Sequence, residues 1–246
     1  MVYVQIYFMI HIYRMKLYKN GIRKNIGSQS EIPRISIKHD NITISGYQSF
    51  IIYDNKIIYK SKVKKYNILE QLIDKFKPEC NSIIDIGCSN GLVSFISSQK
   101  GYNVLALDHD EECIHVMNRI ITHFNINNII CKKFSFGNKI NIKGDILIML
   151  ALIHWIYSCT ALYGNFDKIF KYLSQYVNKY LLIEWVAPND TAIYEFKHLN
   201  FNKQIHEEIY NVINFENSLK KNIGRIVDKI LIDKNTRFLY IVEKCI

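Results

Sequence analysis

The chain has 246 residues and a mass of 29.1 kDa, with 49% hydrophobic and 22% charged residues. This length and composition provide for one α/β domain with a full hydrophobic core and exclude a disordered chain, and no internal repeat indicates a solenoid. The six cysteines form no Cys-x-x-Cys pair and no zinc-ligand spacing, so we predict reduced thiols, no metal site and a cytoplasmic location.

The positive charge is concentrated at the N-terminal end. The whole chain has a net charge of +10, and residues 1–66 contain 12 lysine and arginine residues against three acidic ones. Such a segment, with Lys62, Lys64 and Lys65 near its end, is typical of a surface that binds the phosphates of a nucleic acid. Isoleucine, lysine, asparagine and tyrosine are frequent throughout the chain, however, and codons rich in A and T would produce the same excess. Both interpretations stay open at this point.

The opening stretch, MVYVQIYFMIHIYRMKLY, is largely apolar. No basic residue precedes the apolar run, no cleavage site follows it, and Gln5 and His11 interrupt it. We therefore expect neither a signal peptide nor a membrane-spanning helix. We expect an edge strand here, or an extension upstream of a start at Met9 or Met15.

Two hairpins and a helix are predicted next. RISIKHDNITI (34–44) and SFIIYDNKIIYKS (49–61) alternate or run apolar around Asp-Asn turns, which is typical of β-hairpins. Between residues 62 and 76 apolar residues recur at helical spacing, and Pro78 ends the segment. We therefore divide the chain into a basic N-terminal extension with the predicted β-hairpin structure, residues 1–61, and a main domain, residues 62–246.

The stretch SIIDIGCSNGLVSF (82–95) reads as an apolar strand, a tight turn and a helix that starts at Leu92. In an α/β fold such a turn forms a ligand crevice at the carboxyl edge of the sheet, and glycines allow a sharp bend and a close approach. The dinucleotide pattern GxGxxG would need glycine at positions 89 and 92 as well, and no Walker A lysine follows. We therefore predict a site for an adenosine ligand without a pyrophosphate, formed by Asp85, Gly87, Cys88, Ser89, Asn90 and Gly91.

A second acidic residue supports this site. The strand NVLALD ends at Asp108, 21 residues after Gly87, where such folds place an acid that accepts hydrogen bonds from ribose hydroxyls. We expect Asp110 to cap the following helix, whose first turn is acidic. Further along, strand-like runs alternate with helical segments as far as residue 244. This alternation predicts a mostly parallel sheet with helices on both faces.

Together, IIDIGCSNG and LALDHD resemble motif I and the acidic second motif of the class I S-adenosylmethionine-dependent methyltransferases. GDILIMLALIHWIYS, KYLLIEWVAPND and RFLYIVEK resemble the fourth, fifth and last strands of a bacterial group of these enzymes that is associated with nodulation or surface-polysaccharide proteins. The resemblance covers residues 62–244. It implies a Rossmann-like sheet of seven strands with the last one antiparallel, S-adenosylmethionine as cofactor, and His109 and Leu150 as further cofactor contacts. No acidic residue follows NIICKKF, which leaves Phe134, Ser135 or Phe136 to contact adenine.

The resemblance implies transfer of an activated methyl group, for which the enzyme chiefly aligns the acceptor. A base is needed only for a hydroxyl or a protonated amine. His154, expected at the end of the fourth strand, is the leading candidate because imidazole titrates near neutral pH, and Glu184, expected at the end of the fifth, is the second. Each also has a structural interpretation, as a packing or loop-orienting residue. Trp155, Tyr157 and Trp185 either wall the acceptor pocket or belong to the core.

Two functions fit these features. The first is a methyltransferase with an unidentified acceptor, for which a small molecule or glycan is favoured and RNA is a further candidate. The second is an inactive methyltransferase-like module that binds RNA or a protein. The retained Asp108 favours the enzyme, because a binding module has no need of a ribose acid. The oligomeric state does not follow from the sequence.

Overall fold

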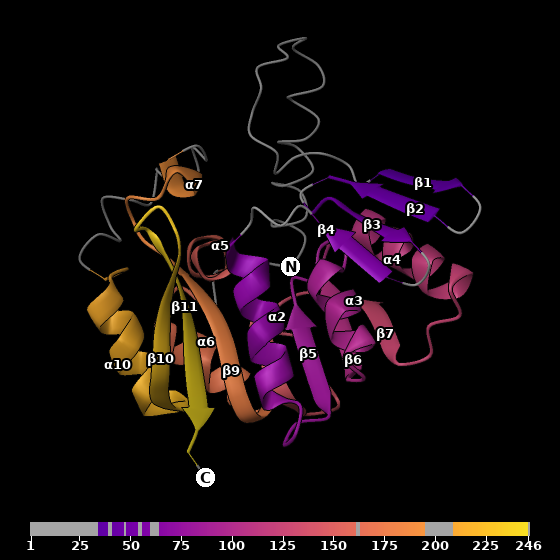
Figure 1. Ribbon diagram of the computed structural model, residues 1–246. Helices are drawn as coiled ribbons and strands as arrows, with labels where there is room; N and C mark the ends of the chain where they lie inside the picture. Colours follow the sequence, from indigo (N-terminus) through magenta and orange to yellow (C-terminus); the bar gives the residue numbers. More distant parts are fainter. Residues whose placement is uncertain are drawn as a thin grey trace.

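A computed structural model describes residues 34–38, 41–46, 48–53, 56–59, 64–160, 163–194 and 209–245. The opening apolar stretch and its expected edge strand lie outside these residues, as does Lys62. The described chain forms a seven-stranded sheet with helices on both faces and a four-stranded antiparallel sheet (Figure 1). None of the described helices has the length and apolar character of a membrane span.

The seven-stranded sheet has the strand order β10-β11-β9-β8-β5-β6-β7. Its strands are β5 (Ser82–Ile86), β6 (Asn103–Asp108), β7 (Ile129–Lys133), β8 (Gly144–Met149), β9 (Val177–Val186), β10 (Gly224–Asp233) and β11 (Arg237–Lys244). β11 is antiparallel to both of its neighbours, whereas β7, β6, β5, β8 and β9 pair in parallel. The predicted Rossmann-like sheet with an antiparallel last strand is therefore confirmed. β5 lies between β6 and β8, so the turn after it is at the centre of the carboxyl edge.

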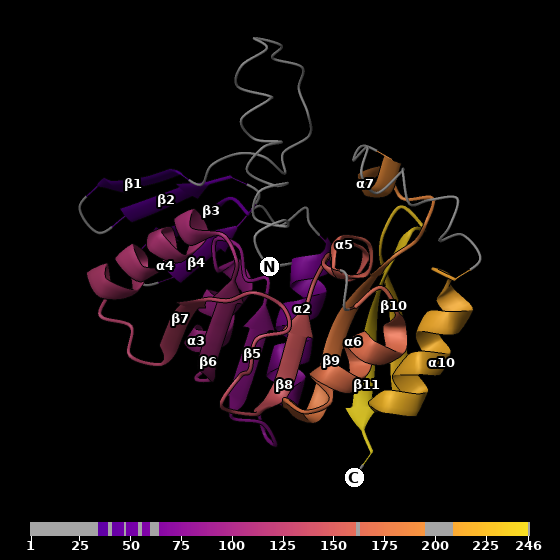
Figure 2. The same ribbon diagram turned by 180° about the vertical axis from the view of Figure 1, so that it is seen from behind.

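Helices cover both faces of this sheet (Figures 1 and 2). One face packs against α2 (Lys64–Phe76), α3 (Leu92–Gln99) and α4 (Glu111–His123), and the other against α5 (Ile153–Cys159), α6 (Phe166–Leu173) and α10 (Val212–Asn222). Adjacent strand residues point to opposite cores: Ile83 and Ile146 face the first set of helices, and Ile84 and Leu147 the second. A strand buried on both faces has to be apolar at nearly every position, which explains the continuous apolar runs.

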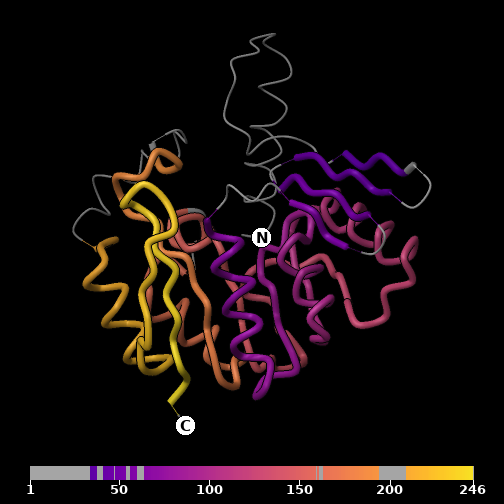
Figure 3. Tube along the Cα trace, viewed as in Figure 1, coloured from indigo at the N-terminus to yellow at the C-terminus, as the bar shows by residue number. Residues whose placement is uncertain are grey.

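The four-stranded sheet consists of β1 (Arg34–Lys38), β2 (Asn41–Ser45), β3 (Phe50–Tyr53) and β4 (Lys56–Tyr59), which confirms both predicted hairpins. Ile42, Ile44, Phe50 and Ile52 are buried in the same apolar cluster as α2 and α3. The tube in Figure 3 shows the small sheet beside α3 and α4. The described part of the N-terminal extension therefore shares its core with the main domain.

The predicted position of His154 is wrong. His154 was expected at the end of the fourth strand, but that strand, β8, ends at Met149, and His154 lies in the first turn of α5. A bend separates the two elements at Ala151, whose φ of +50° is in the left-handed region. The run ILIMLALIHWI is apolar throughout, so its periodicity does not reveal where the strand stops and the helix begins.

Candidate functional site

The turn between β5 and α3 has an unusual backbone. Its φ angles are +77° at Gly87, +51° at Ser89 and +88° at Gly91. A Cβ on Gly87 would lie 2.2 Å from Leu152 Cδ1, and one on Gly91 would lie 2.5 Å from Met117 Cε. Both positions therefore need glycine for conformation and for space. Ser89 has to tolerate the left-handed region, at a cost of roughly 1–2 kcal/mol.

The end of β6 holds this turn in place. Gly87 N and Cys88 N both donate to Leu107 O, at 2.7 and 3.1 Å. Ser89 N donates to Asp108 Oδ2 at 2.7 Å. The strained serine is thus fixed by a buried carboxylate, and the two sequence motifs form one structural unit.

Asp108 is 7% exposed and is the acidic centre of the site. Besides the bond from Ser89, its Oδ1 accepts from Asp110 N at 2.9 Å and lies 3.2 Å from His109 Nδ1. Burial by itself raises the pKa of this carboxyl, but the His109 imidazole and the two backbone N–H groups outweigh burial and lower the pKa below its usual value. Asp108 is therefore a carboxylate at neutral pH and can accept further hydrogen bonds. Asp110 also accepts from Glu112 N, which confirms its role as the cap of α4.

Asp85, at the end of β5, has a different electrostatic state. It is 3% exposed, and Ser94 Oγ of α3 donates to its Oδ2 at 2.7 Å. Burial raises the pKa of Asp85 to about 7, against a smaller lowering by the Ser94 hydroxyl. Its charge at neutral pH therefore depends on what lies next to it, and a cation would favour the ionised form.

Cys88 and Asn90 face the protein interior. The Cys88 thiol lies 3.6 Å from Met117 Sδ, and burial raises its pKa well above the usual value, so it has no nucleophilic character. Asn90 is 1% exposed; its Nδ2 donates to the backbone oxygen of Gln48 at 3.1 Å, and its Oδ1 accepts from Cys113 Sγ. The side chains of Cys88 and Asn90 therefore pack on the interior side of the turn. Gln48, in the β2–β3 loop, was not predicted from the sequence.

Two more segments approach the same edge of the sheet. Leu150, Ala151 and Leu152 follow β8, and the side chain of Leu152 lies over Gly87. Phe134 follows β7, and its N–H donates to Asp108 O at 2.7 Å. The structure thus brings Asp85, the glycine turn, Asp108, Leu150 and Phe134 to one edge, as expected for strands whose carboxyl ends meet there.

His154 is 2% exposed, and neither of its ring nitrogens has a hydrogen-bond partner among the described residues. Burial and the positive charge of Arg237 lower its pKa to about 3. Such an imidazole is neutral at pH 7 but binds a proton weakly, whereas an effective general base has a pKa near the working pH. This environment favours a packing role over proton transfer.

Glu184 lies inside β9 and is fully buried. Its Oε2 pairs with Lys65 Nζ of α2 at 3.1 Å, and its Oε1 with Arg237 Nη1 of β11 at 3.4 Å. Arg237 Nη2 also pairs with Asp190 at 2.9 Å. Removing the Glu184 carboxylate or one of its two cationic partners would leave a buried charge uncompensated. This environment favours a structural role for Glu184. Lys65, whose side chain is 12% exposed, is thus engaged by Glu184, and its role in a phosphate-binding surface stays a prediction.

Of the three aromatic residues that either wall an acceptor pocket or belong to the core, Tyr157 and Trp185 belong to the core. Trp185 is 2% exposed and stacks on Tyr210, with ring centroids 4.8 Å apart. Tyr157 packs against the same Tyr210 and against Phe166. Trp155 is partly exposed.

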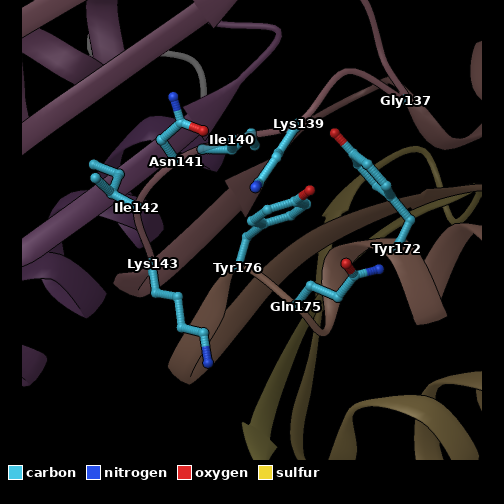
Figure 4. A pocket seen from close by; sticks show the side chains of 9 residues that line it. All are labelled: Gly137, Lys139, Ile140, Asn141, Ile142, Lys143, Tyr172, Gln175 and Tyr176. Carbon is cyan, nitrogen blue, oxygen red and sulfur yellow. The ribbon is translucent and has the colours of Figure 1, made fainter.

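A cavity of about 510 Å³ lies elsewhere, lined by residues of the segment 137–143 and by Tyr172, Gln175 and Tyr176 (Figure 4). This segment leads into the amino end of β8, and Tyr176 precedes the amino end of β9. The cavity is therefore at the edge of the sheet opposite to Asp108. Among the described residues, no group of three His, Cys, Asp or Glu side chains could hold a metal ion, and Cys80, Cys88, Cys113, Cys131 and Cys245 form no disulfide bonds.

Comparisons with known proteins agree with this geometry. The model of one protein family, described as tellurite resistance protein TehB, matches residues 52–158, which is less than half of the chain. No curated protein sequence matches. Among solved structures, magnesium protoporphyrin IX methyltransferase (ChlM) from Synechocystis PCC 6803 with bound SAH is similar with a TM-score of 0.55 and 14% identity, over 74% of this chain and 84% of that one.

Two further structures are similar. An S-adenosylmethionine-dependent methyltransferase from Clostridium acetobutylicum ATCC 824 gives a TM-score of 0.54 and 14% identity, over 75% of this chain and 93% of that one. A TehB-like SAM-dependent methyltransferase from Corynebacterium glutamicum ATCC 13032 gives a TM-score of 0.51 and 12% identity, over 72% of this chain and 87% of that one. The chain has the fold of the class I S-adenosylmethionine-dependent methyltransferases, which confirms the resemblance. Within that class, its central part is similar to TehB, and the finer likeness to the nodulation group stays a prediction.

Proposed function

We propose that this protein is an S-adenosylmethionine-dependent methyltransferase. The observation that carries the proposal is the buried Asp108 carboxylate, hydrogen-bonded to Ser89 N in a turn that needs glycine at positions 87 and 91. This arrangement places an acceptor for ribose hydroxyls beside a glycine-containing turn at the carboxyl ends of β5 and β6, where α/β folds bind their ligands.

The residues at this edge fit the charges of the cofactor. Asp108, ionised at neutral pH, accepts from the ribose hydroxyls, and Asp85 ionises next to the cationic end of the ligand. The turn at residues 87–91 lies between these two carboxylates and contacts the middle of the cofactor. Phe134, Ser135 or Phe136, which follow β7, contacts the adenine, and Leu150, which follows β8, is a further cofactor contact. When bound, the cofactor supplies a methyl group that is already activated by the sulfonium.

The contribution of the chain to the reaction is then alignment of the acceptor, which provides about 7–11 kcal/mol where the geometry is good. His154 and Glu184 are disfavoured as bases by the burial and pairing described above. With neither of these described residues favoured as a base, the proposed acceptor is an atom that is nucleophilic at neutral pH without first losing a proton. This favours a small-molecule acceptor over a glycan hydroxyl, and the internal pairing of Lys65 weakens the case for RNA. The description of the matched family makes tellurite one compound to test.

The experiment has two steps. Calorimetric titration with S-adenosylhomocysteine tests the cofactor site directly, and saturable binding with one site per chain is the expected result. Incubation with methyl-labelled S-adenosylmethionine and separate pools of small molecules, glycans, RNA and protein then identifies the acceptor class. Absence of binding in the first step would refute the proposed function, whatever the second step gives.

A further inference from the structure

The first turn of α3 is capped from a distant part of the chain. Gly91 is the residue at the N-cap position and has no side chain to accept a hydrogen bond. Leu92 N, at the start of the helix, instead donates to Gln48 Oε1 at 3.0 Å. Ser, Thr, Asp or Asn normally serves this purpose from the N-cap position itself. Here Gly91 is required by the turn, so the capping oxygen has to come from elsewhere.

Gln48 makes a second contact with the same turn. Its backbone oxygen accepts from Asn90 Nδ2 at 3.1 Å. Gln48 and Asn90 are 6% and 1% exposed, so water does not replace these bonds easily. One glutamine thus holds the residues on both sides of Gly91, just as Asp108 holds Ser89 on the other side of the turn. Left-handed residues persist where the surroundings fix them firmly.

The β2–β3 loop is itself anchored. On either side of Gln48, Ile44 of β2 and Phe50 of β3 are buried against the helices, and the Phe50 ring lies 6.0 Å from that of Phe95 in α3. Ser49 Oγ closes the loop by donating to Gly46 O. Gln48, β1 and β2 all precede residue 52, where the match to the family model begins. This support for the turn is therefore outside the matched part of the chain.

We propose that Gln48 is a positioning residue for the cofactor turn and that the small N-terminal sheet is thereby part of the cofactor site. This inference rests on the proposed function. Gln48 acts through Leu92 and Asn90: it keeps the turn in the conformation to which the cofactor binds, so that the cofactor does not have to order the turn itself.

The test compares three variants of the full chain. Gln48→Met keeps the length and volume of the side chain but removes the acceptor, Gln48→Glu keeps an acceptor oxygen at the N-terminus of α3, and Ser49→Ala removes a neighbouring bond of the same loop that does not reach α3. Two quantities are measured: hydrogen exchange of the Leu92 amide, and the affinity for S-adenosylhomocysteine by calorimetry.

We expect Gln48→Met to speed exchange at Leu92 and to weaken S-adenosylhomocysteine binding by roughly 5- to 30-fold. Gln48→Glu should keep Leu92 protected, and Ser49→Ala should behave like the parent in both measurements. Parent-like affinity in Gln48→Met, or equal loss in Ser49→Ala, would overturn the inference while the proposed function stands. If the parent does not bind S-adenosylhomocysteine, the proposed function fails, and exchange at Leu92 still decides whether Gln48 holds the turn. If Gln48→Met does not fold, the test depends on Gln48→Glu. Loss of Leu92 amide protection in that variant overturns the inference, whereas retained protection with parent-like affinity for S-adenosylhomocysteine supports the inference.

Discussion

Replacing Asp108 by asparagine is the sharpest test of the cofactor site. Asp108 Oδ2 accepts from Ser89 N, and Oδ1 accepts from Asp110 N and the exposed His109 ring. Alanine would leave the N–H groups of both Ser89 and Asp110 without this partner, whereas asparagine keeps an acceptor oxygen for one of them. A hydrogen bond to a charged group contributes about 1.5–3 kcal/mol and a neutral one about 0.5–1.5 kcal/mol. Asparagine loses one ribose bond and weakens the other, which is roughly 2–4 kcal/mol, or roughly 30- to 1,000-fold in affinity.

The assay is calorimetric titration of the folded variant with S-adenosylhomocysteine, with thermal unfolding as a check on folding. Asp110→Asn is the matched control, since it makes the same charge change two residues further on, where asparagine is as good a helix cap as aspartate. The control should bind within about twofold of the parent. If Asp108→Asn also binds within about threefold, the ribose role of Asp108 is refuted.

Three other changes test the remaining site residues. Cofactor binding at pH 7 should release about half a proton, because the pKa of Asp85 is about 7 and a cation favours its carboxylate. Calorimetry in buffers of different ionisation enthalpy measures this proton release, and Asp85→Asn should abolish the release. In the free protein the raised pKa of Asp85 means that stability falls as the pH rises from about 4 to above 7, and urea unfolding should show a weaker pH dependence in Asp85→Asn. Ser89→Gly should raise the free energy of unfolding by roughly 0.5–1 kcal/mol, because glycine removes the left-handed strain; a lower value would contradict that reading. His154→Gln should leave kcat within about threefold, and a fall of about 100-fold or more at unchanged cofactor affinity would instead establish a general base.

Local sequence patterns predict much of the fold. The apolar residues of α2 recur at helical spacing because one side of that helix is buried, and Leu69, Ile73 and Phe76 lie on that buried side. The runs of β5, β8 and β9 are apolar at successive positions because both faces of the sheet are covered. The glycine turn and Asp108 were predictable for a similar reason: a sharp bend after a strand and an acid at the end of the next strand are each encoded within a few residues.

The states of the individual side chains depend on partners that are remote in the chain. Leu92 and Gln48 are 44 residues apart, and Glu184 is 119 residues from Lys65 and 53 from Arg237. No spacing rule connects such residues, so sequence reasoning missed Gln48 and treated Glu184 and Lys65 as unrelated. His154 was placed at a strand end because its surroundings are uniformly apolar, and only the bend at Ala151 puts it on a helix. Burial and charge pairing arise when distant elements pack together, and these decide which of the candidate groups can exchange a proton.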